Sequence, residues 1–177
     1  KQILGGYRFI IGRDIRLDAQ GRPRIATSHM FHFSDRFINE YLPYTIELGR
    51  SFVRLEYQSS KAGAKAIFAL DNLWDGLGAL TVVYPEIKYL FGKMTMYPNY
   101  HRECRNMILY FLHKHFPDTE ELVRPLHPFN QSFDSVAMDR LFTGRTFKED
   151  YRILNHAVRE FGFNIPPLVN SYMSLSP

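Results

Sequence analysis

The sequence predicts an α/β (α+β) fold in which helices flank a mixed central β-sheet. A strand-like stretch over residues 44–55 is followed by helical spacing over 66–83 and by a second apolar run over 88–97. A strand–helix–strand order of this length is typical of a βαβ unit with two parallel strands and a right-handed crossover. Of the 177 residues, 45% are hydrophobic and 15% aromatic, enough for the core of one domain over residues 1–177.

The first third of the chain favours a strand, a turn-rich connection and a short helix. Residues 3–11 are strand-like, and "DAQGRP" at 18–23 has turn chemistry that favours a hairpin. "SDRFINEYL" predicts a short helix with Ser34 as its N-cap, ended by Pro43. The strand at 44–55 follows it.

The remaining two thirds alternate helices with extended chain. Apolar residues recur at i, i+3, i+4 and i+7 over 66–83, which indicates a helix packed on the core. "KYLFGKMTMY" at 88–97 predicts a central strand, and 101–115 returns to helical spacing. Thr146 and Glu149 have capping-box spacing ahead of a last helix that ends near Gly162. We expect "NIPPLV" at 164–169 to be extended.

Charge and cysteine content favour a cytoplasmic protein. Twenty-two Lys and Arg against 18 Asp and Glu give a net charge of +4, which suits an acidic or phosphate-bearing partner without requiring one. Cys104 is the single cysteine, which excludes an internal disulfide and favours a reducing compartment.

The chain begins without methionine, directly in a strand, so we expect it to lack N-terminal and C-terminal parts of a longer protein.

Two opposite charges interrupt the strand at 44–55. Strict alternation would place Glu47, Gly49, Ser51 and Val53 on one face, and Ile46, Leu48, Arg50 and Phe52 on the other. A glycine inside a strand often marks a place where a ligand comes close. The pattern indicates a site beside Glu47, although Glu47 and Arg50 could each instead form a structural ion pair with another residue.

The loop after that strand is rich in small and basic residues. Free backbone N–H groups and the positive end of a helix dipole meet where the next helix begins, so the loop could hold a phosphate. The alternative interpretation is that these serines and lysines simply keep an ordinary surface loop solvated. The loop residues concerned are Ser59, Ser60, Lys61, Gly63 and Lys65.

The central residues resemble a known enzyme superfamily. "TIELGRSFVRLEYQSSKAGAKAIFALDNLWDGLGAL", then "YLFGKMTMYP", resembles the Gcn5-related N-acyltransferases (GNAT) in the branch that acylates ornithine or glycine. The resemblance is greatest to glycine N-acyltransferases of Bacteroidetes, whose relatives carry the label hemolysin. "ILGGYRF" is similar to the strand before the central one in that fold. The resemblance covers nearly the whole chain.

The resemblance implies transfer of a fatty or 3-hydroxyacyl group from a thioester to an amino acid amine, as a step in aminolipid synthesis. Glu47 would be the base, with Arg50 as a second catalytic candidate and Gly49 and Ser51 in the substrate pocket. A backbone N–H near Phe52 or Val53 would bind the developing oxyanion.

The implied donor is the phosphopantetheine of an acyl carrier protein, and the loop from Ser59 to Lys65 would hold its phosphate end. This loop has fewer arginines and glycines than the family's coenzyme A loop, which favours a carrier protein over coenzyme A. No permanently bound cofactor and no metal are implied. The partners are then an acyl carrier protein and the acceptor amino acid, in the cytoplasm or at the inner face of the cell membrane, with no nucleic acid.

Three other patterns have simpler interpretations. The histidines in "HMFH" at 29–32, "HKH" at 113–115 and at 127 do not have zinc-ligand spacing. Trp74 has the periodicity of a core residue. The N-terminal arginines support the rival hypothesis of a noncatalytic basic module that binds nucleic acid or an anionic membrane surface; they are Arg8, Arg13, Arg16, Arg22 and Arg24.

Overall fold

The computed structural model describes residues 3–57, 64–128 and 134–175, which form two compact units. Unit 1 comprises residues 1–93 and 122–127, and unit 2 comprises 94–121 and 128–177. Unit 1 holds a mixed sheet with helices, which confirms the predicted α/β class, and the helices of unit 2 complete the chain. The single-domain assignment stays a prediction.

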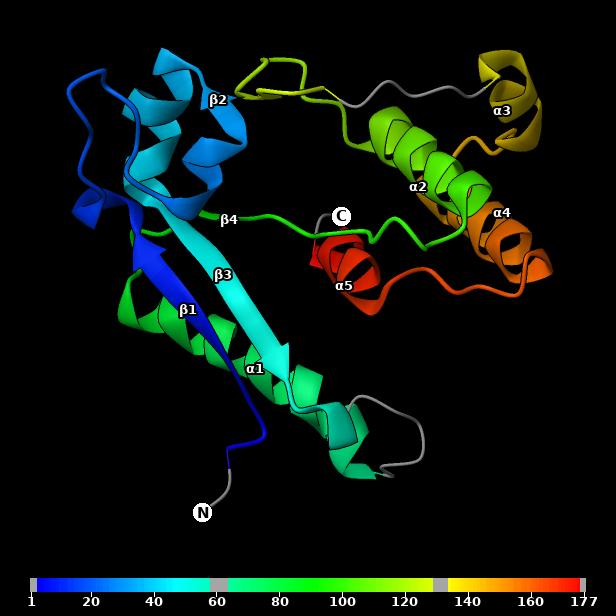
Figure 1. Cartoon of the computed structure of the whole chain (residues 1–177), viewed down its shortest axis with the longest axis horizontal. Helices are drawn as coiled ribbons and strands as arrows, with labels where there is room; N and C mark the ends of the chain where they lie inside the picture. Colours follow the sequence, from blue (N-terminus) through cyan, green and yellow to red (C-terminus); the bar gives the residue numbers. More distant parts are fainter. Residues whose placement is uncertain (1–2, 58–63, 129–133, 176–177) are drawn as a thin grey trace. The chain divides into compact units, whose positions relative to one another are not determined.

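The sheet of unit 1 has the order β1-β3-β4 (Figure 1). β1 (Gly5–Ile11) pairs antiparallel with β3 (Thr45–Val53), and β4 (Tyr89–Gly92) pairs parallel with β3. The connection between β3 and β4 contains α1 (Ala64–Val83), which confirms the predicted βαβ unit. The strand predicted over 88–97 is present but shorter, and the prediction that it is central is wrong, because it forms an edge of the described sheet.

A β-bulge interrupts the pairing of β1 with β3. Arg8 lies opposite Gly49 and Gly6 opposite Phe52, so Tyr7 faces both Arg50 and Ser51. Arg50 has the left-handed backbone conformation, with φ of 52°. An extra residue of this kind shifts the alternation of every side chain beyond it.

The two faces of the sheet pack against different parts of unit 1. One face, covered by α1, buries a cluster formed by Ile11, Ile46, Leu48, Leu77 and Ile87. The other face is covered by the segment between β1 and β3. Its aromatic-rich cluster centres on Ile25, Phe33, Phe37 and Leu42.

The covering segment consists of short turns and one strand. Its helical turns are Gly12–Asp14, Ala26–His29, Phe37–Tyr41 and Leu42–Tyr44, and β2 (Phe31–Phe33) pairs with β5 (Val123–Pro125). A bridge between Leu17 and Pro23 confirms the predicted hairpin. The Ser34 hydroxyl accepts the Phe37 N–H at 3.1 Å, which confirms the predicted cap. A Cβ at Gly12 would lie 1.6 Å from the Leu42 carbonyl oxygen, so only glycine lets these turns meet.

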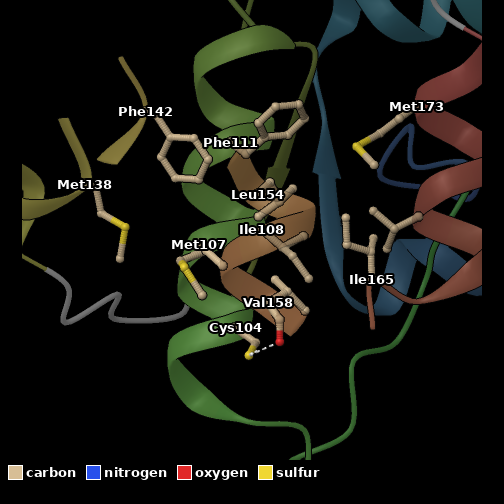
Figure 2. Packing of buried hydrophobic residues seen from close by; sticks show 12 residues of the cluster. Cys104, Met107, Ile108, Phe111, Met138, Phe142, Leu154, Val158, Ile165 and Met173 are labelled. Atoms are coloured by element: carbon tan, nitrogen blue, oxygen red, sulfur yellow. Dashed lines mark hydrogen bonds between the residues drawn. The ribbon is translucent and has the colours of Figure 1, made fainter. Parts of the chain in front are cut away.

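Unit 2 is a set of helices around one hydrophobic cluster (Figure 2). It contains α2 (Arg102–His115), α3 (Ser135–Leu141), α4 (Phe147–Glu160) and α5 (Pro167–Leu175). Side chains of α2 and α4, including Ile108, Phe111 and Leu154, are fully buried. The capping box of Thr146 and Glu149 is confirmed. The extended chain predicted over 164–169 is wrong from Pro167 on, because proline is favoured at the first position of a helix.

A buried carboxylate joins α2 to the start of α4. Asp150 is fully buried, and its Oδ2 lies 2.7 Å from Lys114 Nζ and 2.9 Å from His115 Nε2. The Gly144 N–H donates to Oδ1 at 2.8 Å. Burial alone would raise the pKa of Asp150, but the hydrogen bonds from Lys114, His115 and Gly144 outweigh burial and hold this pKa below its usual value.

We expect Asp150→Asn to lower the free energy of unfolding by about 3 kcal/mol near neutral pH, because it leaves the Lys114 ammonium without its counter-charge. The depressed pKa implies that the carboxylate stabilises the fold above the unfolded-state pKa of about 4, and that this contribution is lost as the pH falls through the lower folded-state pKa. Urea unfolding should therefore show that, between about pH 6 and about pH 2, the free energy of unfolding falls less in Asp150→Asn than in wild type. The exposed Glu103→Gln in the same unit is the control, and parallel pH profiles of wild type and Asp150→Asn would contradict the assignment.

Candidate functional site

Glu47 is a buried carboxylate in the middle strand of the sheet. It lies between Ile10 of β1 and Phe91 of β4, and both neighbours pack in the aromatic-rich cluster. Only 9% of Glu47 is exposed. The Thr27 hydroxyl donates to Glu47 Oε1 at 2.7 Å, and the other carboxylate oxygen has no hydrogen-bond partner within the described residues.

Thr27 is held in place by the turn at Ala26–His29. This threonine is 2% exposed, the Met30 N–H donates to its carbonyl at 2.9 Å, and the Ser28 hydroxyl donates to the Pro23 carbonyl. Among the described residues, the neutral Thr27 hydroxyl is the one hydrogen-bond donor to the carboxylate, so Glu47 can still accept a hydrogen bond from another group. Nothing in the sequence pattern indicated Thr27, because its contact depends on how the turn folds over the sheet.

The sheet opens directly beyond Glu47. β4 ends at Gly92, opposite Leu48, so among the described residues no strand pairs with Gly49–Phe52 on the β4 side of β3. These four residues are exposed, whereas the four residues before them in β3 are buried. A Cβ built on Gly49 meets no atom of the described residues within 4 Å, which leaves open space next to Glu47 in the described part of the chain.

The bulge changes which side chains share the Glu47 face. The Phe52 ring lies 3.2 Å from a Cβ built on Gly6, and Gly6 belongs to the face of Arg8 and Ile10. Phe52 is therefore on the Glu47 face. The expectation that Ser51 and Val53 share it is wrong, because alternation resumes at Phe52 and places both on the opposite face, where Val53 lies near Leu73 of α1.

Arg50, the second catalytic candidate, is an exposed member of the bulge. Alternation in the sequence places Arg50 and Glu47 on opposite faces of the strand. In the part of the chain that the structure describes, no ion pair joins these two residues. The left-handed conformation of Arg50 is unfavourable for a residue with a Cβ, at a cost of roughly 1–2 kcal/mol. Such strain at a non-glycine residue is a reason to test for a function.

Most of the predicted phosphate loop lies outside the described residues. Ser59, Ser60, Lys61 and Gly63 belong to that part, and Lys65 is in the first turn of α1. Phe52, expected near the donor, is 51% exposed. The roles of these residues therefore stay predictions.

The structure describes residues of the other motifs as well. Within the described residues, no group of three His, Cys, Asp or Glu could hold a metal ion. His115 contacts Asp150, and Trp74 packs against the cluster on the α1 face. Two of the five N-terminal arginines are in ion pairs, Arg13 with Glu86 and Arg22 with Asp18. None of the described helices has the length and apolar character needed to cross a membrane.

Comparison with known proteins gives two close relatives. The glycine N(alpha)-acyltransferase of Bacteroides thetaiotaomicron is 66% identical over all 177 residues. Throughout its length, the chain is similar to glycine N(alpha)-acyltransferases. The protein of the same name from Phocaeicola vulgatus is 62% identical over the same length. The chain spans about half of each relative, 52% and 54% respectively, and no family model and no solved structure matches it.

The bulge gives a test that separates the backbone role of Arg50 from a chemical one. We expect Arg50→Gly to raise the free energy of unfolding by up to about 1 kcal/mol, because glycine adopts positive φ without steric cost. Arg50→Val should lower it, because a β-branched residue tolerates this conformation poorly. Urea unfolding measures both, and equal stability of the two variants would rule out the left-handed backbone at residue 50. If the guanidinium takes part in catalysis, Arg50→Gly loses product formation while gaining stability.

Proposed function

We propose that this chain is part of a GNAT-superfamily N-acyltransferase that moves a fatty acyl group from a thioester to the amine of glycine. The observation that carries the proposal is the buried Glu47 carboxylate next to an open stretch of the same strand. Similarity to two glycine N(alpha)-acyltransferases over the full 177 residues supports an acyltransferase. Because the relatives are almost twice as long, the remainder of such a protein would contribute to the complete site.

The reaction needs a proton acceptor close to the attacking amine. The amine nitrogen attacks the thioester carbonyl carbon, the C–N bond forms, and the C–S bond breaks to release a thiol. The proton lost by the amine goes to the Glu47 carboxylate, directly or through a water molecule, and the thiolate leaving group takes up a proton. The unpartnered oxygen of Glu47 is suited to this step, while Thr27 fixes the other oxygen.

The open stretch of β3 is suited to the donor. A pantetheine arm contains amide groups that can hydrogen-bond to an unpaired strand edge, much as a peptide does when it adds to a sheet. A backbone N–H near Phe52 would then bind the oxyanion that develops on the thioester oxygen. The resemblance assigns the phosphate end of the arm to the loop from Ser59 to Lys65, and Gly49 leaves room for the reacting carbon.

The finer assignments are proposed on sequence resemblance. The donor is an acyl carrier protein, with acyl coenzyme A as the alternative, and the acyl group is fatty or 3-hydroxylated. Glycine is the preferred acceptor, with ornithine as the alternative, and the product is an intermediate of an aminolipid. The enzyme works in the cytoplasm or at the inner face of the membrane. A detergent-like product would explain the hemolysin label of related sequences.

Glu47→Gln in the full-length protein should lower product formation at least about 10²-fold, the usual contribution of a general base. The fold should be kept, because the glutamine carbonyl can still accept the Thr27 hydroxyl. Mass spectrometry of N-acylglycine formed from an acylated carrier protein measures the effect. Glu40→Gln, at an exposed glutamate of the same unit, is the control. Full turnover by Glu47→Gln would remove this residue from the mechanism.

Side chains added at Gly49 test whether the open space is used. Gly49→Ala and Gly49→Val should change the free energy of unfolding by less than about 1 kcal/mol, because the added atoms meet no described neighbour. Product formation should fall in steps with side-chain size, by more than about 10-fold for valine, because both substrates must approach Glu47 here. Unchanged activity in Gly49→Val would place the reaction elsewhere.

A further inference from the structure

Arg8 is the cationic side chain that the strand register brings to the Glu47 face. It lies directly opposite Gly49, one pair along from Ile10 and Glu47. Directly paired residues have their Cβ atoms about 5 Å apart on the same face, and diagonal neighbours such as Arg8 and Glu47 about 7–8 Å apart. β1 and β3 run side by side through this region (Figure 1).

Arg8 has no structural task in the described part of the chain. It is exposed, and no hydrogen bond or ion pair with another described residue involves it. Some other arginines of unit 1 form ion pairs, for example Arg13 with Glu86 and Arg54 with Glu56. The residue opposite Arg8 has no side chain, and the register places Arg8 on one strand and Glu47 on the next as the charged residues of this face next to Gly49.

A small zwitterion matches this pair of charges. The amine of an α-amino acid would lie toward Glu47, and its carboxylate would lie toward Arg8, whose planar guanidinium binds carboxylates through two parallel hydrogen bonds. Phe52, on the same face beyond Arg8, borders the far side of the space. A substrate that carries both groups on one carbon is short enough to lie on this face of the sheet between the side chains of Arg8 and Glu47.

We infer that Arg8 binds the carboxylate of the acceptor amino acid and thereby positions its amine at Glu47. This inference rests on the proposed function and adds the residue that selects an amino acid over a simple amine. An anionic group of the acyl donor would be attracted to the same guanidinium, so the experiment must distinguish acceptor from donor.

The test uses Arg8→Gln, Arg8→Lys and the control Arg16→Gln in the full-length protein, with glycine and glycinamide as acceptors. Glycinamide keeps the amine but lacks the carboxylate. Wild type should prefer glycine over glycinamide by about 10²-fold in kcat/KM, as expected for loss of a charge-paired partner. In Arg8→Gln the preference for glycine over glycinamide should fall to within a few-fold, because the KM for glycine rises. The KM for the acyl donor and the rate with glycinamide should stay unchanged. Arg8→Lys should restore part of the preference, and Arg16→Gln should match wild type.

The outcomes separate the inference from the function on which it rests. If wild-type protein transfers no acyl group to either acceptor, the proposed function fails. If wild type prefers glycine and Arg8→Gln keeps that preference, the function stands and the inference is wrong. A rise in the KM for the acyl donor, with the acceptor preference kept, would instead assign Arg8 to the donor and also overturn the inference.

Discussion

The extra residue in β3 opposite Tyr7 is the constraint on which the arrangement of the candidate site depends. Before the bulge, β3 has a strand on each side and both of its faces are covered, so Thr45 to Leu48 are buried. At the bulge the alternation reverses and Phe52 joins the face of Glu47 and Arg8. The same strand is therefore a packed core element in its first half and an exposed edge in its second half. Glu47 lies at the boundary between the two.

Among the residues whose burial the structure describes, two carboxylates are buried, and they are satisfied in different ways. Asp150 has a lysine, a histidine and a backbone N–H around its two oxygens, so its negative charge is fixed and its role is structural. Glu47 has a single neutral hydroxyl donor and a little exposed surface. Three donors, one of them a lysine ammonium, leave Asp150 little capacity for a substrate, whereas one oxygen of Glu47 accepts no hydrogen bond from a described residue. This difference favours Glu47, rather than Asp150, as the chemically active group.

Local signals in the sequence predicted local structure well. The caps at Ser34 and Thr146, the helical spacing of α1 and α2, and the βαβ order all follow from the chemistry of neighbouring residues. The sequence also drew attention to Glu47 and Gly49, because charge and glycine are unusual inside a strand, and their roles stay predictions. The bulge was not predictable from alternation alone, since only the register with β1 shows that two residues share one partner. For the same reason Ser51 and Val53 were assigned to the wrong face. Thr27 was missed because its partner is 20 residues away.

The path of the chain between the units limits how this protein can be divided. Residues 122–127 return from the helical unit to the sheet unit, where Val123–Pro125 pairs with Phe31–Phe33 and Leu122 packs in the aromatic-rich cluster. The backbone therefore passes between the units three times, near residues 93, 121 and 127. Neither unit is a contiguous stretch that recombination could exchange intact with another gene. The two units are expected to be inherited together, and to vary together, in any lineage that retains the sheet.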